Sequence, residues 1–147
     1  MTETRDKGAW NNFNQDIIDQ FRANNGSIPE GQFKGAPLLL LTTKGAKSGK
    51  QYTSPLAHTR EGEKYVVIAS KGGAPTNPDW YHNLVANPRV TIEVGTDKFE
   101  ANARVAQGEE RERLYAAQAE LMPGFAEYQK KTTRLIPVVV FERADPA

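Results

Sequence analysis

The stretch that decides the fold is LLLLTTKGAKSGK, residues 38–50, in which an apolar run passes straight into a basic turn. Residues 38–43 predict a strand that is buried on both faces, because short apolar runs bounded by turn residues are typical of core strands. Two glycines mark the turn, and residues 51–58 predict the returning strand. Pro55 has no backbone N–H to donate, so this second strand is expected at a sheet edge or at a bulge.

On either side of this hairpin, short strands and short helices follow one another without a repeat. Strands are predicted over 65–70, 90–94, 98–105 and 136–141, and helices over 10–24, 79–86, 109–121 and 125–131. The strands lack the regular crossover helices of a doubly wound sheet. The sequence therefore predicts an α+β protein, a mostly antiparallel β-barrel with helices packed outside it. We expect one domain over residues 1–147, with an N-terminal helix region at 1–26 and the barrel at 37–142.

Composition limits the chemistry that the chain can perform. Lys and Arg number 19 against 18 Asp and Glu, a formal net charge of +1, so any anion site must be local and no nucleic acid is expected as a partner. The chain has no cysteine, which excludes disulfides, iron–sulfur clusters, thiolate zinc sites and a thiol nucleophile. Its two histidines, His58 and His82, are expected to be packing or surface residues, so no metal site is predicted.

The start of the chain and its apolar runs bear on localisation. The first eight residues are polar and charged, without the apolar region of a signal peptide. The longest aliphatic run, residues 38–41, is far too short to span a bilayer. We therefore expect a cytoplasmic protein, and a peripheral membrane contact through the N-terminal helix is left open.

The basic turn has the composition of an anion site. Residues 44–50 contain three lysines, Ser48 and two glycines, and such a turn can direct N–H groups and positive charge at a phosphate or carboxylate. The turn is not a P-loop, because only three residues separate Gly45 from Gly49, and Gln51 stands where Ser or Thr would bind magnesium. The alternative interpretation is an ordinary solvated β-turn.

The segment from Ser70 to Asn83 is a second candidate site. A predicted strand ends at Ser70, a Gly-Gly pair follows, and the Asn-Pro pair at 77–78 is a good helix start. Strand ends, glycine loops and helix N-termini commonly combine into ligand cradles. Trp80 and Tyr81 then place two aromatic rings in the first turn of the helix. Either one packs in the core while the other lines a pocket, or both are core anchors.

Three pieces of the sequence, by their order and spacing, resemble the deazaflavin-dependent nitroreductase family of actinobacteria. They are residues 38–50, VIASKGG at 67–73 and NPDWYHNLVANP at 77–88, and the resemblance runs from about residue 37 to residue 142. It implies a split β-barrel related to FMN-binding oxidases of pyridoxine phosphate. It also implies coenzyme F420 as cofactor, a carrier with an anionic phosphate and glutamate tail. The implied activity is that of an F420H2-dependent reductase, which transfers a hydride to an electron-poor acceptor such as a quinone or nitroaromatic.

The resemblance also assigns roles to residues. Those expected to bind the cofactor are Ala46, Lys47, Ser48, Gly49, Lys50, Gln51, Pro55, Ile68, Ala69, Ser70, Lys71, Asp79, Trp80, Tyr81 and Asn83. Those expected to contact the substrate are Met122, Phe125 and Tyr128, and the catalytic candidates are Ser70 and Tyr128. Tyr128 keeps the one hydroxyl of the family's late loop and is expected to deliver a proton to the acceptor.

Departures from the family pattern affect the expected substrate. Ala46 replaces a family arginine, so one cation of the turn is missing, and Met122 and Phe125 replace late-loop tyrosines. An aromatic wall without a phenol still suits planar apolar acceptors such as quinones. Two alternatives stay open: a non-catalytic binder or carrier of F420 or a flavin, and an FMN enzyme on the same barrel. A homodimer is also left open.

Overall fold

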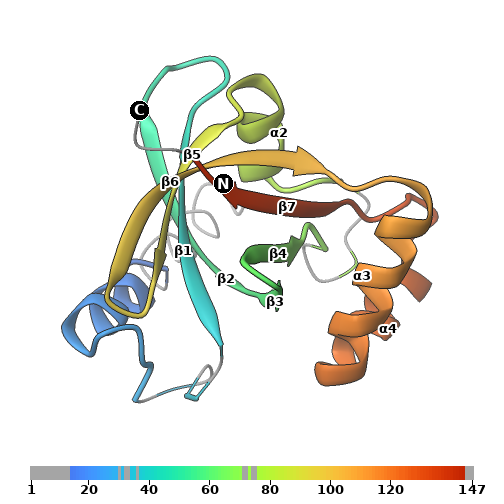
Figure 1. Cartoon of the computed structure of the whole chain (residues 1–147), viewed down its shortest axis with the longest axis horizontal. Helices are drawn as coiled ribbons and strands as arrows, with labels where there is room; N and C mark the ends of the chain where they lie inside the picture. Colours follow the sequence, from blue (N-terminus) through green and yellow to red (C-terminus); the bar gives the residue numbers. More distant parts are fainter. Residues whose placement is uncertain are drawn as a thin grey trace, which may run out of the picture.

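Figure 1 shows one antiparallel sheet that curls into a half-barrel with helices outside it. The computed structural model describes residues 14–29, 31, 34–35, 37–70, 73 and 76–144. The strands are β1 (Leu38–Lys44), β2 (Gln51–Ala57), β3 (Thr59–Glu61), β4 (Lys64–Ile68), β5 (Arg89–Val94), β6 (Asp97–Val105) and β7 (Val138–Arg143). The helices are α2 (Asp79–Ala86), α3 (Gly108–Leu121) and α4 (Gly124–Lys130), and a further helix covers residues 14–23. The predicted α+β barrel with outer helices is confirmed.

A single bent segment joins the two edges of the sheet. The strand order is β2-β1-β5-β6-β7-β4-β3, so β2 and β3 lie at opposite edges, yet only His58 separates them along the chain. The His58 N–H donates to the Pro37 carbonyl at 3.0 Å, which fixes the bend. The predicted single strand over 51–58 is therefore wrong at its end, and β3 was not predicted. Its sequence, Thr-Arg-Glu, has no alternation of apolar and polar residues that could have signalled a strand.

The ends of the other helices and strands can be compared with those predicted from the sequence. Helix α2 spans the predicted residues, whereas β4 ends at Ile68 and β7 begins two residues later than expected. Pro55 lies in β2, an edge strand, where its missing N–H removes no hydrogen bond from a central ladder. The start of the predicted 10–24 helix lies outside the described residues. In the part of the chain that the structure describes, no helix is both long and apolar enough to cross a bilayer.

The four leucines of β1 divide between two hydrophobic clusters. Leu39 and Leu41 pack inside the barrel, and Leu38 and Leu40 pack beneath the 14–23 helix. This division follows from the two-residue period of a strand, whose side chains point alternately to opposite faces. The prediction of a strand buried on both faces is confirmed. The described apolar face of the 14–23 helix, which includes Phe21, is used in this packing.

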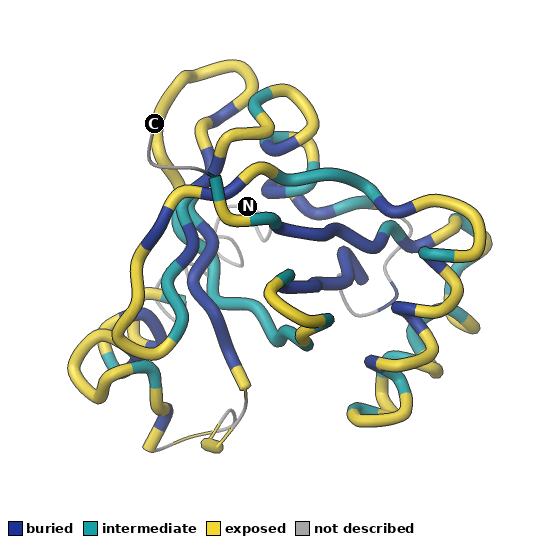
Figure 2. The backbone as a smooth tube through the Cα atoms, viewed as in Figure 1, coloured by how far each residue is buried: buried dark blue, intermediate teal, exposed yellow. Residues whose placement is uncertain are grey.

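Helix α3 covers the outer face of the opposite half of the sheet. Val66 of β4 and Val140 of β7 pack with Leu114 of α3 in a separate cluster. Figure 2 shows the result: β4 and β7 are buried along most of their length, whereas much of α3 is exposed. This packing places α3 beside the end of β4, where the second candidate segment begins.

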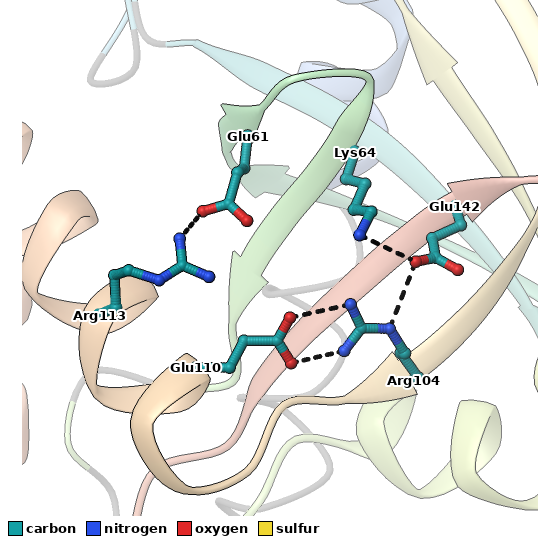
Figure 3. A network of polar contacts seen from close by, with 6 residues as sticks. All are labelled: Glu61, Lys64, Arg104, Glu110, Arg113 and Glu142. Atoms are coloured by element: carbon teal, nitrogen blue, oxygen red, sulfur yellow. Dashed lines mark hydrogen bonds and ion pairs between the residues drawn. The ribbon is translucent and has the colours of Figure 1, made fainter.

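Ion pairs orient α3 on the sheet (Figure 3). The Arg104 guanidinium of β6 binds Glu110 of α3 at 2.6 Å and Glu142 of β7 at 3.4 Å. A second pair joins Arg113 of α3 to Glu61 of β3. The Arg104 guanidinium lowers the pKa of the Glu110 carboxyl through hydrogen bonds and charge. These groups are partly solvated, so each pair adds little stability and mainly sets the angle of the helix.

Candidate functional site

The basic turn, residues 44–50, is closed by its own backbone. The Gly45 N–H donates to the Lys50 carbonyl at 2.7 Å, and the Gly49 N–H donates to the Gly45 carbonyl at 3.1 Å. Gly49 has a φ of +73°, in the left-handed region that favours glycine. At Gly45 a Cβ atom would lie 2.6 Å from the Ser48 Oγ. Gly49 is therefore favoured by the backbone conformation of the turn, and Gly45 leaves room for the Ser48 hydroxyl.

Helix α2 holds this turn through two asparagine side chains. The Asn83 Oδ1 accepts from the Ala46 N–H at 3.1 Å, and the Asn83 Nδ2 donates to the Thr43 Oγ1 at 3.3 Å. The Asn87 Nδ2 donates to the Lys44 carbonyl at 3.3 Å. The two predicted site segments, far apart in sequence, thus lie side by side (Figure 1).

The turn keeps donors and positive charges available for an anion. Its Ala46, Gly49 and Lys50 N–H groups donate to protein acceptors, whereas those of Lys47 and Ser48 have no acceptor among the described residues. The ammonium groups of the three exposed lysines join none of the ion pairs found in the described part of the chain. Free N–H groups beside lysines suit the anionic phosphate and tail that F420 carries.

The end of β4 supplies mostly buried side chains. Ile68 packs in the cluster under α3, whereas Ala69 packs inside the barrel, so neighbouring side chains point to opposite faces. The Ala69 N–H donates to the Pro137 carbonyl at 2.9 Å, which extends the β4–β7 pairing by one residue. Ser70 is 8% exposed. Lys71, a predicted cofactor residue, lies outside the described residues.

The two aromatic residues of α2 have different surroundings. Trp80 is buried in the cluster inside the barrel, whereas Tyr81 is half-buried and lines a cavity. The sequence allowed this division, with one ring in the core and the other at a pocket. Asp79, the remaining α2 candidate of the first turn, is exposed to solvent.

A cavity of about 810 Å³ lies between α2, the start of α3 and the segment before β7. Its lining residues are Tyr81, Val105, Ala106, Gln107, Gly108, Glu109, Arg111, Glu112, Leu135, Ile136 and Pro137. The volume is in the range of small-molecule sites. Tyr81 is the one predicted cofactor residue in this lining, and Pro137 is hydrogen-bonded to another, Ala69. The predicted substrate residues do not line this cavity.

Those substrate residues gather on α4 and its N-terminal end. The rings of Phe125 and Tyr128 meet edge to face, with centroids 5.2 Å apart, and Met122 is half-buried just before α4. The Tyr115 hydroxyl of α3 donates to the Phe125 carbonyl, and burial raises the pKa of this phenol. The late aromatic pair is therefore held by α3.

Tyr128 also adjoins the loop that follows Ser70. A Cβ atom on Gly73 would lie 2.9 Å from the Tyr128 carbonyl oxygen. The Gly73 N–H donates to the Ser70 carbonyl at 2.9 Å. The structure thus brings the segments of both catalytic candidates together, at the junction of α4 and the end of β4.

Sequence reasoning missed two arginines that organise this junction. Arg111 is buried, and its guanidinium donates to the Ile136 carbonyl at 2.8 Å and to the Gln129 Oε1 at 2.7 Å. Arg134 donates to the Asn77 side chain at 2.7 Å and to the Ser70 carbonyl at 2.8 Å. Both stand in runs of charged and polar residues, which usually indicate a solvated face, so the sequence carried no signal for them.

The histidines match the packing and surface roles that were predicted. His58 is half-buried, its ring lies 5.8 Å from that of Tyr65, and burial lowers its pKa. Its Nδ1 atom has no hydrogen-bond partner among the described residues. His82 is exposed. The described residues contain no cluster of acidic and histidine side chains that could hold a metal ion.

Fold and site together define a split β-barrel protein with a basic turn beside a helix that carries two aromatic residues. Residues 15–143 match the family model described as F420H(2)-dependent quinone reductase. An F420H(2)-dependent quinone reductase of Mycobacterium tuberculosis is 41% identical over 126 residues, covering 84% of this chain and 85% of the relative. The chain therefore belongs to the F420H2-dependent quinone reductase family, oxidoreductases whose cofactor is coenzyme F420.

Solved structures agree with this assignment. An F420-H2 dependent reductase is 48% identical, with a TM-score of 0.68, and covers 72% of this chain and 94% of that one. A domain-swapped dimer is 38% identical, with a TM-score of 0.70, and covers 90% of this chain and 98% of that one. The haem storage protein HutZ of Vibrio cholerae, 17% identical with a TM-score of 0.58 over 87% of this chain and 88% of its own, shares the fold alone.

Proposed function

We propose that this protein binds reduced F420 and catalyses hydride transfer from it to a quinone. The observation that carries the proposal is the basic turn, which Asn83 holds against α2. The turn offers exposed lysines and two backbone N–H groups that have no acceptor among the described residues. The family match supports the identity of the cofactor and of the acceptor class.

The residues of the turn would hold the anionic part of the cofactor. Lys47 and Ser48 offer free backbone N–H groups, and Lys47 and Lys50 add positive charge beside them. Pro55 on β2, Ser70 and Tyr81 are proposed to border the ring system. When bound, the cofactor supplies the hydride, so the chain need only orient the two reactants and limit access of water.

Proton delivery is assigned to Tyr128, with Ser70 as the second candidate. Phe125 packs edge to face against the Tyr128 ring, and the Tyr128 hydroxyl lies close to Gly124 at the start of α4. Tyr128→Phe should lower turnover with saturating F420H2 by about a hundredfold, the low end for general acid catalysis. It should also remove a solvent isotope effect on turnover. Unchanged turnover and an unchanged isotope effect would exclude Tyr128.

Fluorescence titration with F420 tests the binding site directly. Lys47→Ala should weaken binding about tenfold and flatten its dependence on salt, because a charge-assisted contact to phosphate is lost. Lys98→Ala is the matched control, since Lys98 is an exposed lysine on β6 away from the turn. Equal effects of the two substitutions would contradict the assignment of the turn.

The same titration separates the alternatives. Tight F420 binding without reoxidation by any quinone would identify a carrier, and preferential binding of FMN would identify a flavin enzyme. A nitroaromatic included among the acceptors tests whether the single late-loop phenol still permits nitro reduction.

We also propose a homodimer. Strand β2 pairs with β1 on one side and leaves the other side of a seven-residue edge strand unpaired by β-strands among the described residues. Such edges pair readily with another chain. A relative of 38% identity is described as a domain-swapped dimer. Light scattering after size-exclusion chromatography should give twice the 16.3 kDa chain mass, and the monomer mass would refute this.

A further inference from the structure

Arg134 binds both ends of the segment that joins β4 to α2. One terminal nitrogen, Nη1, donates to the Asn77 Oδ1 at 2.7 Å, just before α2 begins. The other, Nη2, donates to the carbonyls of Ser70 at 2.8 Å and Ala69 at 3.3 Å, just after β4 ends. A planar guanidinium with its donors in a fixed fork therefore sets the separation and orientation of these two ends.

The middle of the same segment rests on the C-terminal part of α4. Gly73 has a φ of +86°, and a Cβ atom there would lie 2.9 Å from both the Tyr128 carbonyl oxygen and the Lys131 Cβ. Contact this close leaves no room for a side chain. Residues 128–134 thus support the segment at its start, middle and end.

Arg134 is itself held in place by a second layer of hydrogen bonds. The Gln129 Nε2 donates to the Arg134 carbonyl at 2.8 Å, and the Gln129 Oε1 accepts from Arg111 at 2.7 Å and from the Ile136 N–H at 3.1 Å. The buried Arg111 also bonds the Ile136 carbonyl. The guanidinium of Arg134 therefore extends from a fixed backbone.

Packing alone does not explain why an arginine stands at this position. Partial burial lowers the pKa of Arg134, so keeping this charge out of water opposes folding. An apolar side chain would fill the same space without that desolvation. The guanidinium instead donates to Ala69, Ser70 and Asn77, which bound one segment, and this ties the arginine to the conformation of that segment.

We propose that Arg134 is a positioning residue for the cofactor, acting through the two chain ends that it joins, Ser70 after β4 and Asn77 before α2. This inference rests on the proposed function, in which Ser70 and the start of α2 border the F420 ring. Arg134 does not touch the cofactor in this account. It fixes the Ser70 carbonyl and the Asn77 side chain relative to each other, and Gly73 between them packs against the Tyr128 backbone carbonyl.

The test compares Arg134→Lys with Arg143→Lys, since Arg143 of β7 forms an exposed ion pair with Asp97 away from the turn. Lysine keeps the charge of Arg134 but not its planar fork. Arg134→Lys should raise the F420 dissociation constant about five- to tenfold, the loss of one or two hydrogen bonds. It should leave the KM for quinone unchanged, and Arg143→Lys should change neither value.

Two further measurements distinguish positioning from general stability. Amide hydrogen exchange without cofactor should become faster at residues 70 and 77 in Arg134→Lys, and stay unchanged in β1. Guanidinium ion added at low, non-denaturing concentration should restore part of the F420 affinity of Arg134→Ala.

The outcomes separate this inference from the function itself. Failure of the unaltered protein to bind F420 overturns the proposed function and the inference with it. Normal F420 binding by the unaltered protein together with an unchanged dissociation constant in Arg134→Lys overturns the inference alone. The inference also fails if the melting temperature falls while affinity stays constant, because Arg134 would then be a stabilising residue only.

Discussion

Substitutions of Asn83 distinguish the effect of geometry from the effect of charge on anion binding by the basic turn. Its side-chain amide joins Ala46 of the turn to Thr43 of β1, with hydrogen bonds of 3.1 and 3.3 Å. Asn83→Ala removes both bonds. Asn83→Asp keeps an oxygen for the Ala46 N–H, and the Thr43 hydroxyl can turn to donate to the second carboxylate oxygen. Asn83→Asp therefore keeps both hydrogen bonds and adds one negative charge.

The two substitutions have different expected magnitudes. Each lost hydrogen bond is worth about 0.5–1.5 kcal/mol, so the loss of both in Asn83→Ala should cost about 1–3 kcal/mol, or roughly 5- to 150-fold in anion affinity. For Asn83→Asp, a carboxylate about 8 Å from a phosphate costs about 1 kcal/mol at an effective dielectric constant of ~40. That cost corresponds to roughly fivefold weaker binding.

Salt distinguishes the two causes in a fluorescence titration with F420. The defect of Asn83→Asp should shrink toward zero as salt is raised, because the added repulsion is screened. The defect of Asn83→Ala should persist at all salt concentrations, since it reflects a misplaced turn. Its melting temperature should also fall by a few degrees. Binding by Asn83→Ala that equals the unaltered protein at every salt concentration would refute the reasoning.

Three further predictions concern stability. Leu41→Ala removes a fully buried core side chain and should lower the free energy of unfolding by about 2–5 kcal/mol in urea titrations, and a loss below about 1 kcal/mol would contradict its core role. Gly26→Ala should lower the melting temperature clearly, because Gly26 has a φ of +93° and a new Cβ would lie 2.5 Å from the Gly95 Cα; an unchanged value would refute this close approach. Burial lowers the pKa of His58, so below about pH 6.5 the unfolded chain takes up a proton that the folded protein excludes, and stability should fall as pH falls. In urea unfolding over that range, His58→Gln should flatten the slope, and an identical slope would show that another group is responsible.

The sequence patterns that predicted the fold correctly were the apolar runs and the turn and helix-start residues. The four leucines of β1 predicted a core strand, and the Asn-Pro pair predicted where α2 begins. The predicted cap is wrong in detail, because Pro78 is the N-cap residue, no side chain caps the helix, and the Asn77 side chain accepts from Arg134 instead. Strand β3 gave no signal, since its three polar residues become a strand only when the chain bends at His58 and meets β4. Barrel closure is a property of the whole sheet that no local pattern reports.

The candidate site divides in the same way. The basic turn could be predicted from its lysines and glycines, because those residues carry charge and permit the turn wherever they occur. The hydrogen bonds that Asn83 makes to Ala46 and Thr43 could not be predicted, since they depend on where the topology places α2 relative to β1. The role of Arg134 could not be predicted for a related reason. Its acceptors are backbone carbonyls and an asparagine side chain that lie far from it along the chain.

The most direct test is anaerobic rapid mixing of the protein with reduced F420 and a quinone, followed by the absorbance of the oxidised cofactor. We expect reoxidation at a rate that depends on the protein and saturates with both reactants. A cofactor that binds and stays reduced with every quinone offered would contradict hydride transfer as the function of this chain.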